Sequence, residues 1–120
     1  MASLQKTKIA YETTQAVTPL SVPYTATIAL DLSARNNFVI ATLTGNLSLS
    51  FTNPIAGASG YIVLNQDAIG GKTLTITGGN TKTPGGAAII LSTDGDSKDK
   101  LYWDSDDGVT VNLVFQGNFK

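Results

Sequence analysis

Apolar and polar residues alternate along most of the chain from Ala26 onward, as in strands that bury one face. The stretch TIALDLS places Ile28, Leu30 and Leu32 on one side of an extended backbone. The stretch LSLSF (47–51) alternates three apolar residues with two serines in the same way. No long stretch spaces its apolar residues three or four apart, as a helix would, so the pattern predicts an all-β chain.

Turn signals rich in Gly, Asn, Asp and Pro separate the alternating stretches, which predicts about eight strands. Because only three residues separate 38–43 from 47–51, we expect these two strands to form a hairpin around Gly45. The nearly continuous apolar stretch 61–66 predicts a central strand that is covered on both faces. The expected strands cover residues 27–33, 38–43, 47–51, 61–66, 73–77, 88–92, 100–103 and 109–116.

Short strands at this spacing predict an antiparallel β-sandwich, jelly-roll-like, with an extended N-terminal segment. The expected sandwich domain covers residues 26–120. Residues 1–25 differ in composition and form a lead-in that we expect to anchor the domain, with a possible short strand at 9–12. Pro19 and Pro23 would stiffen the exit from this segment.

The alternation also predicts which side chains form the core. Trp103 has the same parity as Leu101, which favours burial of its ring over stacking on a sugar, whereas Tyr102 is the better candidate for an exposed aromatic residue. The expected core consists of Leu49, Phe51, Leu74, Ile76, Trp103, Val111 and Leu113.

Hydroxyl side chains dominate the positions that face away from this core. The chain has sixteen Thr and nine Ser, which together outnumber its seventeen charged residues. Two interpretations remain open. Thr and Ser suit exposed strands, and a neutral hydroxyl face also packs against another protein surface without the cost of desolvating charges.

Composition excludes several classes of function. The chain has no Cys and no His, which removes thiol chemistry, zinc sites built on Cys and the commonest general base. With a net charge of −1 and one arginine, it lacks the basic stripe of a nucleic-acid binder, and its apolar runs are too short to cross a membrane. The N-terminal stretch lacks the apolar region of a signal peptide, which indicates synthesis in the cytoplasm.

Six of the nine acidic residues lie between Asp94 and Asp107. Their spacing does not match an EF-hand, and the strand 100–103 places the two halves of the cluster at opposite ends of a sheet. We interpret them as solvated carboxylates of two turns, with a weak cation site in one turn as the alternative. The sequence therefore assigns no catalytic, cofactor-binding or metal-binding residue, and we expect no enzyme activity.

From Leu43 onward, the order of the turn motifs resembles a module of tailed-bacteriophage structural proteins. The resemblance rests on TGN with L-L-F, NP-GASG, QD-GG-TLT, KTPGG, L-ST, L-W-DG-V-L and a closing GNF, over about two-thirds of the chain. The chain departs from that pattern after its DG turn, where Val109, Thr110 and Val111 replace an expected tyrosine-rich strand.

This resemblance implies an all-β virion component that is not an enzyme and that forms a homotrimer. We expect a small capsid-decorating or head-fibre subunit, located in the virion and attached to other virion proteins through residues 1–25. The alternatives are a receptor-binding tail-fibre tip that contacts host surface glycan, and a free carbohydrate-binding module. Nucleic acid and membranes are not expected partners, and no cofactor is implied.

Overall fold

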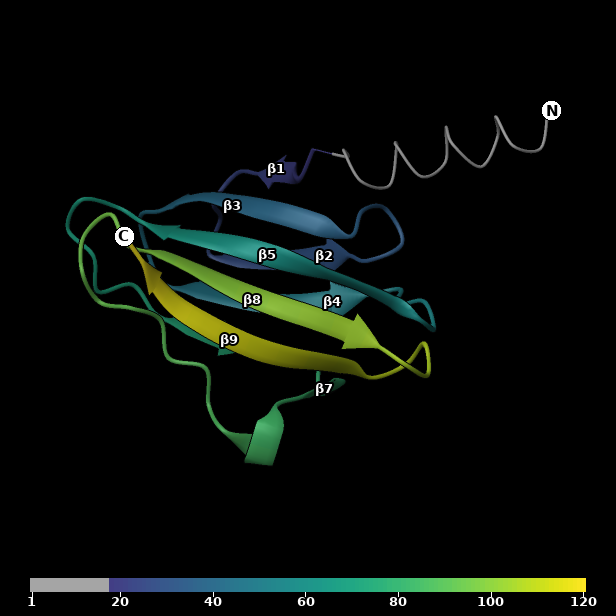
Figure 1. Cartoon of the computed structure of the whole chain (residues 1–120). Coiled ribbons are helices and arrows are strands. Elements are labelled where there is room, and N and C mark those ends of the chain that lie inside the picture. The colour runs from purple at the N-terminus through teal and green to yellow at the C-terminus, as the bar shows by residue number, and fades with distance from the viewer. Residues whose placement is uncertain (1–17) are drawn as a thin grey trace, which may run out of the picture.

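Two β-sheets make up most of the computed structural model, which describes residues 18–120 (Figure 1). A short 3-10 helix, η1 (Pro84–Gly86), lies in the connection between β7 and β8. The strands are β1 (Leu20–Val22), β2 (Thr27–Asp31), β3 (Asn37–Leu43), β4 (Leu47–Thr52), β5 (Ala58–Gln66), β6 (Leu74–Ile76), β7 (Thr81–Lys82), β8 (Lys98–Ser105) and β9 (Val111–Phe119).

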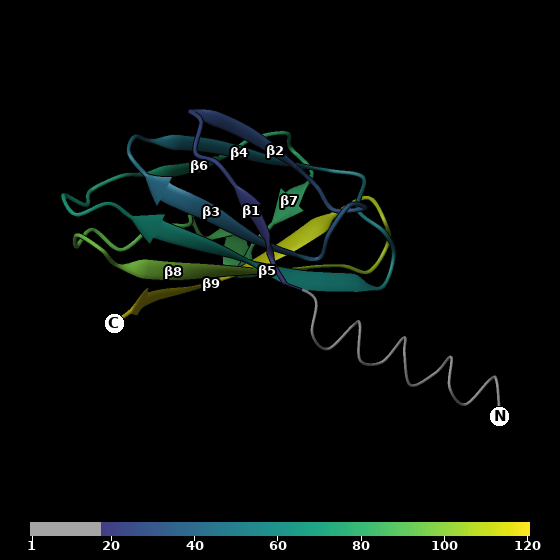
Figure 2. The same cartoon turned by 90° about the horizontal axis from the view of Figure 1, so that it is seen from above.

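The chain alternates between the two sheets from β1 to β6. One sheet has the order β1-β3-β5-β8-β9-β7, and the other has the order β2-β4-β6. Strands β1, β3 and β5 run parallel to one another, as do β2, β4 and β6. Figure 2 shows the three-stranded sheet as a layer above the larger sheet. The first six strands therefore wind as three stacked coils, each of which supplies one strand to each layer.

The expectation of an antiparallel, jelly-roll-like arrangement is wrong. In the six-stranded sheet, β8 pairs antiparallel with β5 and with β9 while the other pairs are parallel, so that sheet is mixed. The three-stranded sheet is entirely parallel. The expected hairpin of 38–43 with 47–51 does not form either. Strand β3 pairs with β1 and β5, whereas β4 pairs with β2 and β6 in the other sheet.

The connection 44–46 explains why the hairpin prediction failed. In a hairpin, two strands exchange backbone hydrogen bonds, whereas here the chain crosses from one layer to the other, and β3 and β4 both turn apolar side chains inward. Ala41 and Thr42 are both exposed at an irregularity in β3, after which Leu43 is buried. The alternation of apolar residues is the same in both arrangements, so it did not distinguish them.

The core predictions are confirmed with one qualification. Leu49, Leu113 and Trp103 are at most 2% exposed, and Ile76 is half-buried against the same cluster. Apolar side chains of both sheets form a single core cluster. Strand β5 is central, between β3 and β8, as predicted, but it is not covered on both faces. On its outer side Val63 is buried, whereas Tyr61 is only half-buried. The inward-facing residues of the alternating pattern thus form the interface between the layers.

Residues 88–92 are not a strand, which contradicts the prediction for this stretch. Ile90 is 75% exposed, whereas Leu91 is buried, so the segment follows the side of the molecule and inserts single residues into the core. The short strand β7, which precedes this segment, instead pairs with the start of β9 at the edge of the six-stranded sheet. The continuous apolar run 88–91 suggested a strand, but it lacks polar–apolar alternation in the sequence and a pairing partner in the described sheets.

The first strand lies within the segment that we expected to be a lead-in. Strand β1 pairs in parallel with β3, with Leu20 opposite Phe38, and the Arg35 guanidinium donates a hydrogen bond to the Thr18 carbonyl at 3.1 Å. The packed fold therefore begins before the expected boundary at Ala26. The possible strand at 9–12 lies outside the described residues.

Candidate functional site

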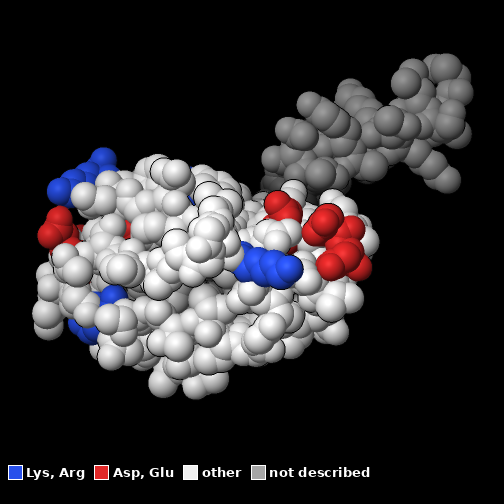
Figure 3. Space-filling model, turned by 90° about the horizontal axis from the view of Figure 1, so that it is seen from below, with Lys and Arg blue, Asp and Glu red and all other residues white. Residues whose placement is uncertain are grey.

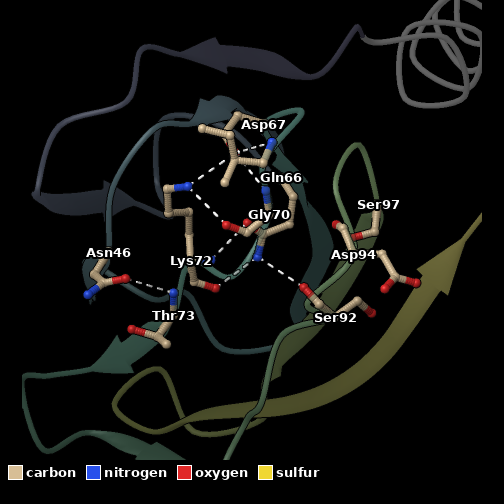
Figure 4. Close-up of polar contacts among 10 residues, drawn as sticks. Asn46, Gln66, Asp67, Gly70, Lys72, Thr73, Ser92, Asp94 and Ser97 are labelled. Atoms are coloured by element: carbon tan, nitrogen blue, oxygen red, sulfur yellow. Dashed lines mark hydrogen bonds and ion pairs between the residues drawn. The ribbon is translucent and has the colours of Figure 1, made fainter.

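Polar residues from several turn motifs meet at one end of the two sheets (Figure 4). Gln66 closes strand β5 and is only 3% exposed. Its side-chain oxygen accepts from the Lys72 backbone N–H at 3.0 Å, and its amide nitrogen donates to the carbonyls of Lys72 at 2.8 Å and Ser92 at 3.0 Å. One amide side chain thus joins β5 to the two loops that leave this end of the molecule.

Asp67 holds the next turn. Its Oδ1 accepts from the backbone N–H groups of Ile69 at 3.1 Å and Gly70 at 2.9 Å, and the Lys72 ammonium lies 3.1 Å from the same oxygen. The Gly70 N–H bond, together with the Lys72 contact, lowers the pKa of the Asp67 carboxyl below its ordinary value. These bonds favour the charged carboxylate, which stabilises the folded turn.

Loops 67–72 and 92–97 pack closely against each other. Gly71 N–H donates to the Thr93 carbonyl at 2.9 Å, and Asp96 N–H donates to the Asp67 carbonyl at 2.8 Å. Gly70 has φ +78°, and a Cβ there would collide with the Thr93 carbonyl, so this position requires glycine. The QD-GG motif therefore specifies a turn and its contact with a second loop.

Asp99 corrects the expectation that the carboxylates between Asp94 and Asp107 are solvated. It is 1% exposed and accepts three hydrogen bonds: from Ser92 N–H at 2.8 Å, from Ser92 Oγ–H at 2.6 Å and from Asn118 N–H at 2.8 Å. The carboxylate ties the start of β8 to the preceding loop and to the end of β9. The signal available in the sequence was its parity, because Asp99 lies two residues before Leu101 and so continues the inward-facing side of that strand.

The acidic residues on the two sides of β8 lie at opposite ends of that strand, as the spacing predicted. Asp107 Oδ1 accepts from the backbone N–H groups of Val109 at 2.9 Å and Thr110 at 2.7 Å, which lowers the pKa of its carboxyl. Within residues 18–120, no three acidic side chains are grouped closely enough to hold a metal ion. The bonded carboxylates of Asp67 and Asp107 hold their own turns, whereas Asp99 joins segments that are farther apart along the chain.

Trp103 is part of the core and is 2% exposed, which confirms its predicted burial. The polar edge of its ring reaches the start of β3, where Nε1–H donates to the Asn36 carbonyl at 2.9 Å. A Cβ at Gly60 would collide with that same carbonyl, so the motif GASG brings β5 close to Asn36. The sequence did not reveal this contact, because it joins residues that are far apart along the chain.

The outer face of the three-stranded sheet carries the hydroxyl side chains that the alternation placed outside. Thr27, Ser48 and Thr75 occupy paired positions on β2, β4 and β6. Ala29 and Ser50 form the next pair along the strands. In Figure 2 no described segment covers this layer. The paired positions on its outer side are uncharged apart from Asp31 at the end of β2.

Hollows lie elsewhere on the surface of the described part of the chain. A groove of about 600 Å³ runs beside the edge strand β6 and is bounded by residues 81–83 and 86–89. A smaller hollow of about 310 Å³ lies on the outer face of the six-stranded sheet, near Tyr61 and Tyr102. Figure 3 shows the side that carries η1, where charged side chains gather mainly toward the ends of the molecule.

Comparisons with known proteins do not assign this site. No protein-family model matches the chain, and no curated protein and no solved structure matches it. Among residues 18–120, no helix has the length and apolar character needed to cross a membrane. The functional conclusions therefore depend on the motifs and on the geometry of the described residues.

Proposed function

We propose that the chain is a bacteriophage virion structural protein, a small capsid-decorating or head-fibre subunit that assembles as a homotrimer. The sequence resemblance supports this proposal. Motif residues such as Gln66 and Asp67 bond to backbone groups of turns, which is the role expected of an architectural protein. We also propose that the two sheets form a β-sandwich, which is supported by the single core that the two layers share.

The observation that carries the proposal is the uncharged outer face of β2, β4 and β6. Side chains at its centre, such as Ser48 and Ser50, are small and half-buried, so a second protein surface would approach the sheet closely. Packing there would desolvate hydroxyl groups, which costs far less than desolvating charges. The outer edges of β2 and β6 are also unpaired within the described residues, which favours assembly over an isolated sheet.

A charge at the centre of this face tests its role. Ser50→Glu should shift the protein from trimer toward monomer in light scattering at micromolar concentration, because assembly would bury an unpaired carboxylate. Gln116→Glu adds the same charge on the exposed outer side of the other sheet and should leave the trimer intact. A wild-type protein that is monomeric at this concentration would contradict the proposed assembly.

Attachment to the virion is tested separately. We propose that residues 1–17 bind other virion proteins, while the β-sheets project outward. Deleting residues 1–17, which leaves the contact of Thr18 with Arg35 in place, should give a folded oligomer that no longer decorates virions lacking the native protein, as labelled electron micrographs would show. A truncated protein that is insoluble or melts far lower would instead show that the segment belongs to the fold. Absence of the full chain from purified virions would contradict the virion assignment.

A further inference from the structure

Two rows of side chains lie next to each other on the outer face of β5, β8 and β9. In the first row, Tyr61 is paired with Tyr102, and Tyr102 with Val114. In the second row, which lies two residues further along β8, Asp104 is paired with Asn112 and with Ser59. An apolar, aromatic row thus borders a row of hydrogen-bonding groups.

A hollow of about 310 Å³ lies over these two rows. Tyr102 is 39% exposed and Val114 is 47% exposed, so the apolar row is open to solvent. Figures 1 and 2 show no described segment crossing this face. The volume is at the lower end of the range found for small-molecule sites, which combine apolar walls with a few fixed polar groups.

The polar row is held in place by its own hydrogen bonds. The Asn112 side-chain amide donates to Asp104 Oδ1 at 2.8 Å and to Asp106 Oδ1 at 3.3 Å. An ionised carboxylate offers about four acceptor positions, and this amide occupies one of those on Asp104. Exposed Asp104 therefore presents further acceptor positions beside the tyrosine row.

We propose that this hollow binds the ring of a neutral pyranose sugar. The C–H face of the ring would lie on Tyr102, and its hydroxyl groups would donate to the Asp104 carboxylate. The tyrosine supplies a rigid apolar platform, and the carboxylate accepts stronger hydrogen bonds than a neutral group does. Asp104 and Asp106 disfavour an anionic sugar, since like charges repel.

A second copy of the chain is the competing occupant, and the carboxylates argue against it. Two such faces packed together would bring Asp104 side chains of like charge into a desolvated interface, which is costly unless each carboxylate is paired. Lys100 is the cation nearest to the polar row along β8, but its ammonium lies beside the Tyr61 ring, 5.9 Å from the centroid, rather than in that row. Sugar hydroxyl groups would instead replace the hydrogen bonds that water makes to the carboxylate. The site is separate from the uncharged face of β2, β4 and β6, so the inference goes beyond the proposed virion function.

Titration with methyl β-D-galactopyranoside and methyl β-D-glucopyranoside tests the proposal, with binding followed by ¹H–¹⁵N NMR. Saturable shifts of the Asn112 side-chain amide are expected with at least one of them. Tyr102→Ala should weaken binding by about tenfold or more, whereas Tyr102→Phe keeps the ring and should bind as the wild type does. Phe119→Ala removes another exposed aromatic side chain, opposite Lys98 on the same sheet, and should not change the affinity.

Three results would overturn the proposal. The first is no shift with either glycoside at about 50 mM, far above the Kd of a weak millimolar site. The second is equal affinity of the wild type and Tyr102→Ala. The third is a smaller oligomer for Tyr102→Ala with no glycoside binding by the wild type, which would make this face a protein interface. These outcomes do not depend on whether the chain decorates virions.

Discussion

The indole N–H of Trp103 donates a hydrogen bond to the backbone carbonyl of Asn36 at 2.9 Å. This bond joins β8 to the residue that precedes β3, across the intervening strand β5. Because the indole is almost fully buried, its single donor needs a partner within the protein. The contact fixes the position of the chain as it enters the second coil.

Replacing Trp103 with Phe should therefore destabilise the protein. The change removes the donor and leaves the Asn36 carbonyl without this partner, in addition to removing part of a packed ring. We expect a loss of about 2–4 kcal/mol in the free energy of unfolding, measured by urea denaturation. Tyr102→Phe at the exposed neighbouring position should change stability by less than about 0.5 kcal/mol. Equal effects of the two variants would contradict the role assigned to this bond.

Replacing Asp99 should lower the free energy of unfolding more than replacing any other acidic residue of the described chain. Asp99→Ala leaves the buried N–H of Ser92, its hydroxyl and the Asn118 N–H without their acceptor. We expect a loss of about 2–4 kcal/mol in urea denaturation. Asp94→Ala, at an exposed position in the preceding loop where the carboxylate makes an exposed ion pair with Lys120, is the control and should have a much smaller effect. If both variants unfold alike, the buried carboxylate does not hold the loops together.

The two faces of β4 should respond differently to truncation. Leu49 is fully buried between the layers, so Leu49→Ala should cost about 2–5 kcal/mol through lost burial and a residual cavity. Ser48→Ala on the outer face should change the stability of the monomer by no more than about 0.5 kcal/mol. Thermal and urea unfolding at low protein concentration compare the two, and a large effect of Ser48→Ala would show that this hydroxyl group is needed by the fold itself.

Stability should fall in acid through three bonded carboxylates. Hydrogen bonds hold the pKa values of Asp31, Asp67 and Asp107 below the ordinary value of 3.8. For Asp31 the largest contribution to the lower pKa comes from the Ser33 hydroxyl. Groups with a lowered folded-state pKa stabilise the protein fully above about pH 5, and this contribution is lost as the pH falls through 3.8 to the folded values. Unfolding midpoints in urea at pH 3 and pH 6 test this effect.

Replacing one of these groups tests its share. Asp67→Asn keeps an acceptor oxygen for the turn but does not titrate, so the variant should lose less stability than the wild type between pH 6 and pH 3. Asp106→Asn, in the exposed turn after β8, serves as the matched control, because its carboxylate receives only a 3.3 Å contact from the Asn112 side-chain amide. An acid response of Asp67→Asn identical to that of the wild type would contradict the prediction.

The alternating pattern by itself determined which side chains face the core. Ile28, Leu49 and Leu113 are buried because a strand of period two presents one side to the other layer, whatever its neighbours are. The same pattern placed Ser48 and Ser50 on the outer side and Trp103 inside. This information is local, since it depends only on successive residues of one strand.

The tertiary structure decided which strands are neighbours. The connection 44–46 fits a hairpin within one sheet and a crossing between two layers equally well in sequence, and only packing of the whole core selects the crossing. The hydrogen bond from Trp103 to Asn36 and the buried carboxylate of Asp99 depend on that choice, as does the pairing of Tyr61 with Tyr102. Sequence alternation fixes the face of a strand, but the partner of each strand is set by long-range contacts, which no short stretch of sequence contains.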